Sequence, residues 1–193
     1  MKTILSLLLA SGLPLAACAA DQSVDLELAL GLADTHEGGS LGAAQLGMTW
    51  YPTGRIGIEA WFGASADNSL EVVPGPTTSG EENSWINRMH GFGLRYRFFG
   101  DEQRRWQPFV RAGLARADVS YEIIGMNYLF DGTIEYDRYE GNFRRDSVYY
   151  GFGTGYTLDN GWRLSAQILH VPLRVMRVDL ARTEALVGIQ YAF

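Results

Sequence analysis

Eight segments of the chain alternate apolar with polar or small residues, and this two-residue period constrains the fold more than any other feature. In the last segment, apolar residues from Ala185 to Phe193 occupy every second position, and Glu184 and Gln190 lie on the opposite parity. Such a period is typical of strands, because successive strand side chains point to opposite faces. The eight segments are 24–33, 44–51, 56–63, 91–98, 108–124, 148–156, 162–168 and 182–193.

We therefore expect an all-β fold, an eight-stranded antiparallel up-and-down transmembrane β-barrel. A soluble sandwich or a lipocalin-like barrel would show the same alternation with its apolar face turned inward. The apolar faces approach the ~9–11 residues that a tilted spanning strand needs, and short and long links alternate. In segment 108–124 the apolar parity changes, which predicts a β-bulge near Ala115.

Residues 1–20 have the features of a signal peptide, because Lys2 precedes an apolar core at 4–15 that is too short to span a membrane. Residues 21–193 are then the mature barrel. A chain of 193 residues suits a single domain. Its net charge of −6 argues against a nucleic-acid partner.

The sequence leaves two processing sites open. Small residues favour cleavage after Ala19 or Ala20, whereas residues 15–18 resemble a bacterial lipobox, which implies cleavage before a lipidated Cys18. Because Cys18 is the single cysteine, the chain has no internal disulfide framework and no cysteine-based metal site.

The parity opposite the apolar face carries charges of both signs. Since the interior of an eight-stranded barrel has room for little more than its own side chains, we expect these groups to pair in a polar core, with the three glutamates matched to the four arginines. Such a network would plug the lumen or leave a narrow polar path. Glycines on the same parity, such as Gly91 and Gly93, are expected to leave space that larger residues could fill. The predicted polar network comprises Glu27, Glu59, Arg95, Arg97, Arg111, Arg163, Gln167, Glu184 and Gln190.

Aromatic residues gather at one end of the predicted strands, as in the girdles that anchor barrels at the lipid interface. The predicted girdle includes Trp50, Tyr51, Phe98, Phe99, Trp106, Phe109, Tyr156, Trp162 and Phe193.

Three stretches, 51–63, 96–115 and 151–167, together with the closing segment, resemble the hairpins of the OmpA-type and OmpW-type small outer-membrane barrels. The resemblance implies location in the bacterial outer membrane, contact with its lipid and lipopolysaccharide, and recognition of Tyr191 and Phe193 by the barrel-assembly machinery. It implies architecture more than function, because such barrels include anchors, adhesins, solute channels and enzymes.

An even number of strands places both termini in the periplasm. The turns at Pro52, Asp101 and Asn160 would then be periplasmic. The extracellular loops would be 34–42, 67–85, 125–145 and 171–180, and we expect an external ligand at 67–85 or 125–145.

Loop 125–145 carries two unusual sets of residues. Its carboxylates, which could hold Ca²⁺ but suit a solvated loop better, are Asp131, Glu135, Asp137 and Glu140. Its aromatic residues, which favour binding to a partner, are Tyr128, Phe130, Tyr136, Tyr139 and Phe143.

Enzymatic signals are weak. His170 resembles the histidine of outer-membrane lipid A deacylases, but the nucleophilic serine expected two residues on is replaced by Pro172. His36 and His90 have no metal-ligand spacing. We therefore expect no catalysis, cofactor or metal, and either a structural or surface-interaction role or passage of small, hydrophobic solutes. The alternative is a deacylase-like, lipid A-modifying enzyme.

Overall fold

A computed structural model describes residues 23–35, 40–73, 79–99, 105–128, 133–158, 161–175, 178–179 and 181–193. The predicted signal peptide and Cys18 lie outside these residues. The described residues form ten strands. These are β1 (Ser23–Thr35), β2 (Ser40–Tyr51), β3 (Ile56–Val73), β4 (Ser79–Arg97), β5 (Trp106–Tyr128), β6 (Ile134–Thr157), β7 (Trp162–Val171), β8 (Arg174–Val175), β9 (Val178–Asp179) and β10 (Arg182–Ala192).

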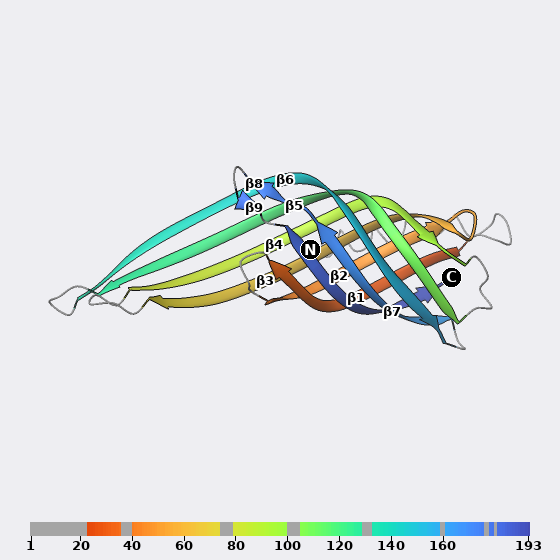
Figure 1. Cartoon of the computed structure of the whole chain (residues 1–193), viewed down its shortest axis with the longest axis horizontal. Coiled ribbons are helices and arrows are strands. Elements are labelled where there is room, and N and C mark those ends of the chain that lie inside the picture. The colour runs from red at the N-terminus through yellow and green to blue at the C-terminus, as the bar shows by residue number, and fades with distance from the viewer. Residues whose placement is uncertain are drawn as a thin grey trace, which may run out of the picture.

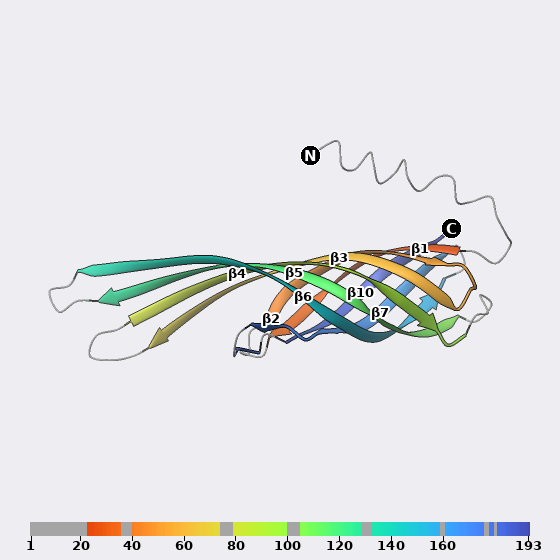
Figure 2. The same ribbon diagram turned by 90° about the horizontal axis from the view of Figure 1, so that it is seen from above.

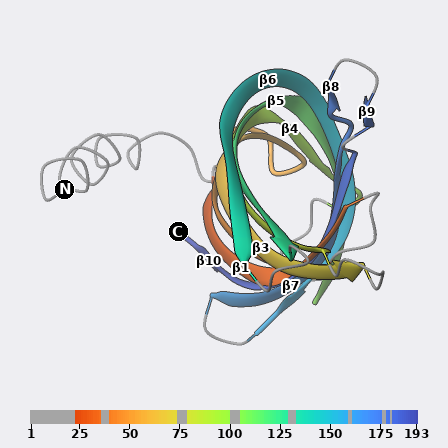
Figure 3. The same ribbon diagram turned by 90° about the vertical axis from the view of Figure 1, so that its left-hand side faces the viewer.

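Eight of these strands close into a barrel in the order β1-β10-β7-β6-β5-β4-β3-β2, and Figure 3 shows the ring end-on. All neighbouring pairs are antiparallel. The barrel closes between β1 and β10, where the amide of Phe193 donates to the carbonyl of Val24 over 3.0 Å. The predicted fold is confirmed. No helix in the described part of the chain is long and apolar enough to cross a membrane.

Outward positions on the barrel strands are mostly apolar, as the alternation predicts. Leu28, Leu46, Phe92 and Val187 are examples, each about half exposed or more. In water these side chains would form a large unfavourable surface, whereas in a bilayer they contact lipid.

The two ends of the barrel differ. One end, here called the turn end, carries the chain terminus Phe193 and the short connections, including Gly54 and Gly161 with φ of 68° and 82°. At the other end, β3, β4, β5 and β6 continue to pair with one another beyond the barrel (Figures 1 and 2). The last pair between β2 and β3 is Gly42↔Ala66, and the pairing of β6 with β7 begins only at Tyr150.

We call the strand ends beyond these limits the extended sheet: 67–73 of β3, 134–148 of β6, and the ends of β4 and β5 between them. This sheet corrects the predicted loops, because most of 67–85 and 125–145 is strand. The predicted strands ended where the lipid-facing alternation ended. A β-ladder is held by backbone hydrogen bonds and continues without an apolar face. The predicted loop 171–180 likewise contains the small β8–β9 pair.

The predicted bulge near Ala115 is also wrong. Residues of β5 pair one to one with β4 and with β6 through this region, including Ala115↔Gly91 and Ala115↔Ser147. The apolar parity changes because Ala117 and Val119 fill the lumen, where they are buried, and not because the strand slips.

Candidate functional site

The centre of the lumen is an ion-pair network around Arg95. This arginine donates from Nε to Glu59 and from Nη2 to Glu27, both over 2.9 Å. Arg111 donates to the second oxygen of Glu59 over 2.8 Å. All four side chains are at most 4% exposed. Buried charges need such partners, because an unpaired charge in this position is strongly destabilising.

Neutral groups complete this central network. Tyr149 donates its hydroxyl to Glu59 over 2.6 Å, and Ser165 donates to Glu27 over 2.7 Å. Arg111 also donates to Gln167 over 2.9 Å. Gln167 in turn donates to Gln45 of β2 over 3.0 Å. Seven barrel strands, β1 to β7, thus send polar side chains to one level of the lumen.

A second ion-pair group lies nearer the turn end and is centred on Asp25. Arg163 donates to Asp25 over 2.9 Å, and Arg97 donates to the same carboxylate oxygen. The guanidinium of Arg97 stacks 3.4 Å from the ring centre of Tyr51. The sequence analysis paired Arg97 and Arg163 with glutamates and omitted Asp25. Asp25 lies on the same inward parity as Glu27, so the alternation of β1 could have identified it.

The third group corrects the expected partner of Glu184. Its carboxylate lies 2.6 Å from Nη2 of Arg182, an arginine two residues earlier on the same face that the prediction missed. Arg182 also donates to Ser65. The structure buries Gln190 as well, but its Nε2 has no hydrogen-bond partner within the described part of the chain.

Toward the end of the barrel that carries the extended sheet, the lumen changes from polar to apolar. Trp61 and Tyr149 meet edge to face with ring centres 5.4 Å apart, in the middle of this layer. Tyr149 therefore joins both layers, with its ring in the apolar layer and its hydroxyl on Glu59. The buried members of the apolar layer are Trp61, Met89, Ala115, Ala117, Val119, Tyr149, Leu169, Val171 and Leu173.

The inward glycines leave space that larger side chains fill. A Cβ atom on Gly91 would lie 2.4 Å from Nε1 of Trp61, and one on Gly93 would lie 2.4 Å from the hydroxyl of Tyr149. The large lumen side chains already occupy the volume that these glycines free.

The aromatic residues of the turn end form several contacting pairs. Trp106 packs on Tyr156 with ring centres 5.0 Å apart, and Trp162 packs on Tyr191, which in turn contacts Phe193. Phe98 and Phe99 are exposed and Trp50 is partly buried, all three at this same end. Two predicted members are placed differently.

Tyr51 and Phe109 are buried in the lumen, where their rings lie under Arg97 and Arg95. Both belong to the inward parity, which the girdle prediction overlooked. Their rings cover buried guanidinium groups and do not contact the bilayer.

His170 lies on the outward face of β7. Its ring centre is 5.0 Å from that of Tyr150, and its Nδ1 is 2.9 Å from the hydroxyl of Thr183. Neither contact supplies a nucleophile activated by a base and an acidic partner. His90 is exposed on β4, and His36 lies outside the described residues.

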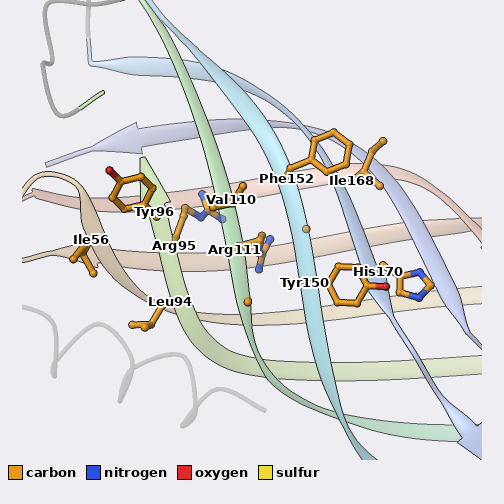
Figure 4. A pocket seen from close by; sticks show the side chains of 12 residues that line it. Ile56, Leu94, Arg95, Tyr96, Val110, Arg111, Tyr150, Phe152, Ile168 and His170 are labelled. Carbon is orange, nitrogen blue, oxygen red and sulfur yellow. The ribbon is translucent and has the colours of Figure 1, made fainter. Parts of the chain in front are cut away.

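Figure 4 shows Tyr150 and His170 beside a shallow hollow of about 600 Å³ on the outer surface. Its wall is mostly apolar and includes Leu94, Phe152 and Ile168. The strand ladders beneath it are continuous, from Leu94↔Ala112 to Phe152↔Ile168. The hollow is therefore a depression in the lipid-facing surface and does not open between strands into the lumen.

The extended sheet separates the carboxylates predicted to act together. Strand alternation places Glu135 and Asp137 on one face of β6 and Glu140 on the other, and Asp131 lies outside the described residues. No group of three metal-ligating side chains occurs in the part of the chain that the structure describes.

The aromatic residues predicted in this region are also divided. Tyr136 and Tyr139 are each 62% exposed, whereas Phe143 packs against the apolar layer of the lumen. Tyr128 ends β5, and Phe130 lies outside the described residues.

Charged residues line the outward face where the sheet leaves the barrel. Arg116 binds both oxygens of Asp146, over 2.5 and 2.9 Å, and Arg144 pairs with Asp118. The hydrogen bond from Arg116 lowers the pKa of Asp146 below its ordinary value. These pairs are exposed to solvent, unlike those in the lumen.

Comparison with solved structures shows the same architecture in small outer-membrane barrels. The N-terminal β-barrel domain of Pseudomonas aeruginosa OprF matches with 16% identity and a TM-score of 0.55, covering 89% of this chain and 97% of that one. Ail, the attachment invasion locus protein of Yersinia pestis, matches with 11% identity, a TM-score of 0.54 and the same coverages. Acinetobacter baumannii CarO matches with 12% identity and a TM-score of 0.51, again covering 89% and 97%.

At these identities the likeness establishes the fold alone. A search of curated proteins gave no significant match. The family model for the outer membrane protein beta-barrel domain matches residues 5–193, which is nearly the whole chain. With the closed eight-stranded barrel and its apolar outer face, this match shows that the chain belongs to the outer-membrane β-barrel family.

Proposed function

We propose that this protein is a non-conducting barrel that presents the extended sheet at the cell surface as an interaction module. The observation that carries the proposal is the continuation of β3–β6 beyond the barrel, ending in a hairpin whose Tyr136 and Tyr139 are each 62% exposed. Exposed aromatic residues on a rigid sheet offer contact area to a partner at little entropic cost.

In the proposed orientation the turn end faces the periplasm, together with the first and last residues of the barrel, which meet at Val24 and Phe193. The extended sheet is then extracellular. The aromatic residues of the turn end would lie at the inner lipid interface, and the charged residues at the base of the sheet would meet the lipopolysaccharide headgroups. Tyr191 and Phe193 would be read by the barrel-assembly machinery. A surface role agrees with that of Ail, the attachment invasion locus protein of Yersinia pestis, which has the same fold.

Labelling with a membrane-impermeant maleimide tests the orientation. In whole cells, Ser120→Cys in β5 should react because it is exposed at the base of the extended sheet, whereas Thr53→Cys in the turn between β2 and β3 should not. Labelling of only the turn cysteine would reverse the orientation and contradict the proposal.

The interaction itself is tested by shortening the β5–β6 hairpin. Joining Glu122 to Glu140, which are paired neighbours, through a two-residue turn removes the exposed tyrosines and retains the barrel strands. We expect cells that express this variant to lose adhesion to epithelial monolayers or sensitivity to phages that depend on the full chain. If neither property depends on the hairpin, the surface-interaction proposal fails.

Passage of solutes through the lumen is disfavoured by the ion-pair network. Direct contacts link Arg95, Glu27, Glu59 and Arg111 across the lumen, and the apolar layer covers them toward the extended end. We expect no steady channel in planar bilayers. A channel of defined conductance would contradict a closed lumen.

We propose no enzymatic role. The features that carry this view are the contacts of His170, which are a tyrosine ring and a threonine hydroxyl. Mass spectrometry of lipid A should give identical acyl chains with and without the protein, and removal of one chain would support the deacylase-like alternative.

A further inference from the structure

The two faces of the extended sheet carry different side chains. One face continues the wall of the lumen, and we call it the lumen-side face; on β6 it holds Phe143, Tyr139, Asp137 and Glu135. Phe143 packs against the buried apolar layer, whereas Tyr139 is 62% exposed and both carboxylates are exposed as well. The lumen-side face therefore passes from an apolar base to an acidic tip.

Aromatic side chains form the middle of the lumen-side face. Tyr121 of β5 is paired with Gly141 of β6, and its ring lies across that glycine, where a Cβ atom would collide with it. Phe143 and Tyr139 stand two residues to either side of Gly141 on the same face. Three aromatic side chains thus lie close together. Aromatic faces attract cations, and guanidinium groups in particular stack on them.

Acidic residues outnumber basic ones by eight to one in the extended parts of β3–β6, taken as 67–73, 79–87, 119–128 and 134–143. The acidic residues are Asp67, Glu71, Glu81, Glu82, Glu122, Glu135, Asp137 and Glu140. The one basic residue, Arg138, lies on the outward face and contacts Glu122 and Glu140. On the lumen-side face, Asp137 and Glu135 take part in no ion pair with another described residue.

A glycine separates acidic positions within one row of the lumen-side face. Gly125 of β5 is paired with Asp137 on one side and with Glu81 on the other, and Glu81 is paired in turn with Glu71. A Cβ atom on Gly125 would meet only Asp137, at 3.8 Å, among the described residues. Neighbouring strands are about 4.8 Å apart, so a cationic group above Gly125 would lie within reach of acidic residues on both sides. It would also relieve the repulsion between like charges in this row.

We propose that the lumen-side face binds a polybasic segment of a partner protein, with an arginine seated above Gly125. The proposal rests on the proposed role of the extended sheet as an interaction module, and it gives the chemistry of the partner. From Phe143 to Glu135 the face is about 27 Å long, which is the length of about eight extended residues. A single metal ion suits the face less well, because no group of three ligating side chains occurs in the described part of the chain.

Binding of a basic peptide by two matched charge variants tests the face. We would place the full-length protein in phosphatidylcholine nanodiscs and measure the fluorescence anisotropy of labelled octa-arginine. Glu135→Gln/Asp137→Asn should lower the affinity about tenfold, because it removes two carboxylates from the lumen-side face. Glu122→Gln/Glu140→Gln removes the same charge from the outward face and should change the affinity by less than about twofold. Empty nanodiscs should not bind.

Three results would overturn the proposal. They are no binding of octa-arginine by the wild type, equal losses in the two double variants, and a greater loss in the outward variant. Equal losses would mean that the peptide responds to net charge and not to one face. All four substitutions lie outside the barrel, so the variants should keep the unboiled gel mobility of the folded wild type.

The seat above Gly125 has its own variant. Gly125→Leu fills the space between the acidic positions and should lower the affinity for octa-arginine about fivefold or more. Met126→Leu changes the next residue, which faces outward, and should leave the affinity unchanged. Unchanged binding by Gly125→Leu would contradict the proposed seat.

The aromatic contact is tested with two exposed tyrosines on opposite faces. Octa-lysine has the charge of octa-arginine but stacks less well on aromatic rings, so the wild type should bind it about threefold more weakly. Tyr139→Leu should remove this preference for arginine. Tyr136→Leu, at a position that is also 62% exposed but faces outward, should retain it. Equal binding of both peptides by the wild type, or loss of the preference in Tyr136→Leu alone, would contradict the proposal.

The hairpin-shortened variant separates this inference from the proposed function. It lacks Asp137, Glu135 and Tyr139, and it should no longer bind octa-arginine. Hairpin-dependent adhesion without octa-arginine binding by the wild type would reject the polybasic partner and leave the proposed function standing. Octa-arginine binding that requires the hairpin, in cells whose adhesion and phage sensitivity do not, would support the binding face and reject the proposed function.

Discussion

The four strands β3–β6 pass through two environments, and their ion pairs show the difference. Within the barrel, Arg95, Arg111 and Glu59 are at most 3% exposed and contact one another in a shared network. In the extended sheet, Arg144 and Asp118 pair in the same way with 68% and 37% exposure. A buried charge depends on its partner, whereas an exposed one can exchange its partner for water or for another protein. The same type of ion pair is therefore expected to contribute more to stability within the barrel than in the extended sheet, where its members remain accessible to solvent or to a partner.

Removing a carboxylate should give the largest difference in stability loss between the barrel and the extended sheet. Glu59→Leu leaves two buried guanidinium groups without their common partner, so we expect a loss of about 3–5 kcal/mol in the free energy of unfolding. The matched variant Asp118→Leu removes the partner of an exposed arginine and should cost less than about 1 kcal/mol. Urea titration in phospholipid vesicles measures both. Equal losses would show that the lumen is hydrated and that its ion pairs behave like surface pairs.

Truncating a methionine makes the same comparison without charge. Met89 is fully buried in the apolar layer of the lumen, whereas Met126 lies on the extended sheet, where β5 pairs with Gly80 and Tyr136. We expect Met89→Ala to lower the free energy of unfolding by about 2–5 kcal/mol, because it leaves a cavity. Met126→Ala should change it by less than about 1 kcal/mol. Similar values for both would mean that the apolar layer is loosely packed.

Adding one methyl group tests how full the lumen is. A Cβ on Gly91 would lie 2.4 Å from the indole of Trp61, whereas one on Gly125 would have its nearest neighbours at 3.8 Å. Gly91→Ala should therefore destabilise the barrel by about 1–3 kcal/mol through overpacking. Gly125→Ala should be neutral to within about 0.5 kcal/mol. If the barrel tolerates alanine at both positions, Trp61 has space that the structure does not show.

The smallest expected effect concerns pH at the base of the extended sheet. Because the pKa of Asp146 is lowered by the hydrogen bond from Arg116, this pair stabilises the sheet above the ordinary pKa of an aspartate. The contribution is lost as pH falls through the lowered value. Carboxyl NMR titration of Asp146 should show this depression of the pKa, and Arg116→Gln should reduce it, because Arg116 is its main cause. An unchanged titration in Arg116→Gln would mean that the pair does not form in solution.

The sequence indicated the faces of the barrel correctly and the partners only in part. Parity alone placed Glu27, Glu59 and Arg95 on one side of the sheet. It could not show that Arg97 and Arg163 share Asp25, because such contacts join strands that are distant around the ring. The heights of side chains inside a barrel depend on the stagger of its strands, which no single segment encodes.

Some predictions were wrong because they assumed that all strand residues lie in the same lipid-facing environment. The predicted loops ended the strands where lipid contact ended, and the predicted bulge treated Ala117 and Val119 as outward residues. Tyr51 and Phe109 were assigned to the girdle from their position along the strands. Their inward parity, which was available, places them beneath guanidinium groups.

The sequence by itself determined the period, the number of barrel strands and the side that faces lipid, because alternation acts locally and repeats in every segment. The tertiary structure decided which charges meet, that the lumen is divided into a polar and an apolar layer, and that four strands continue past the barrel. These features depend on strand register and on the absence of a neighbour beside β3 and β6 within the described chain. That absence turns the far part of β6 from a barrel strand into an open edge.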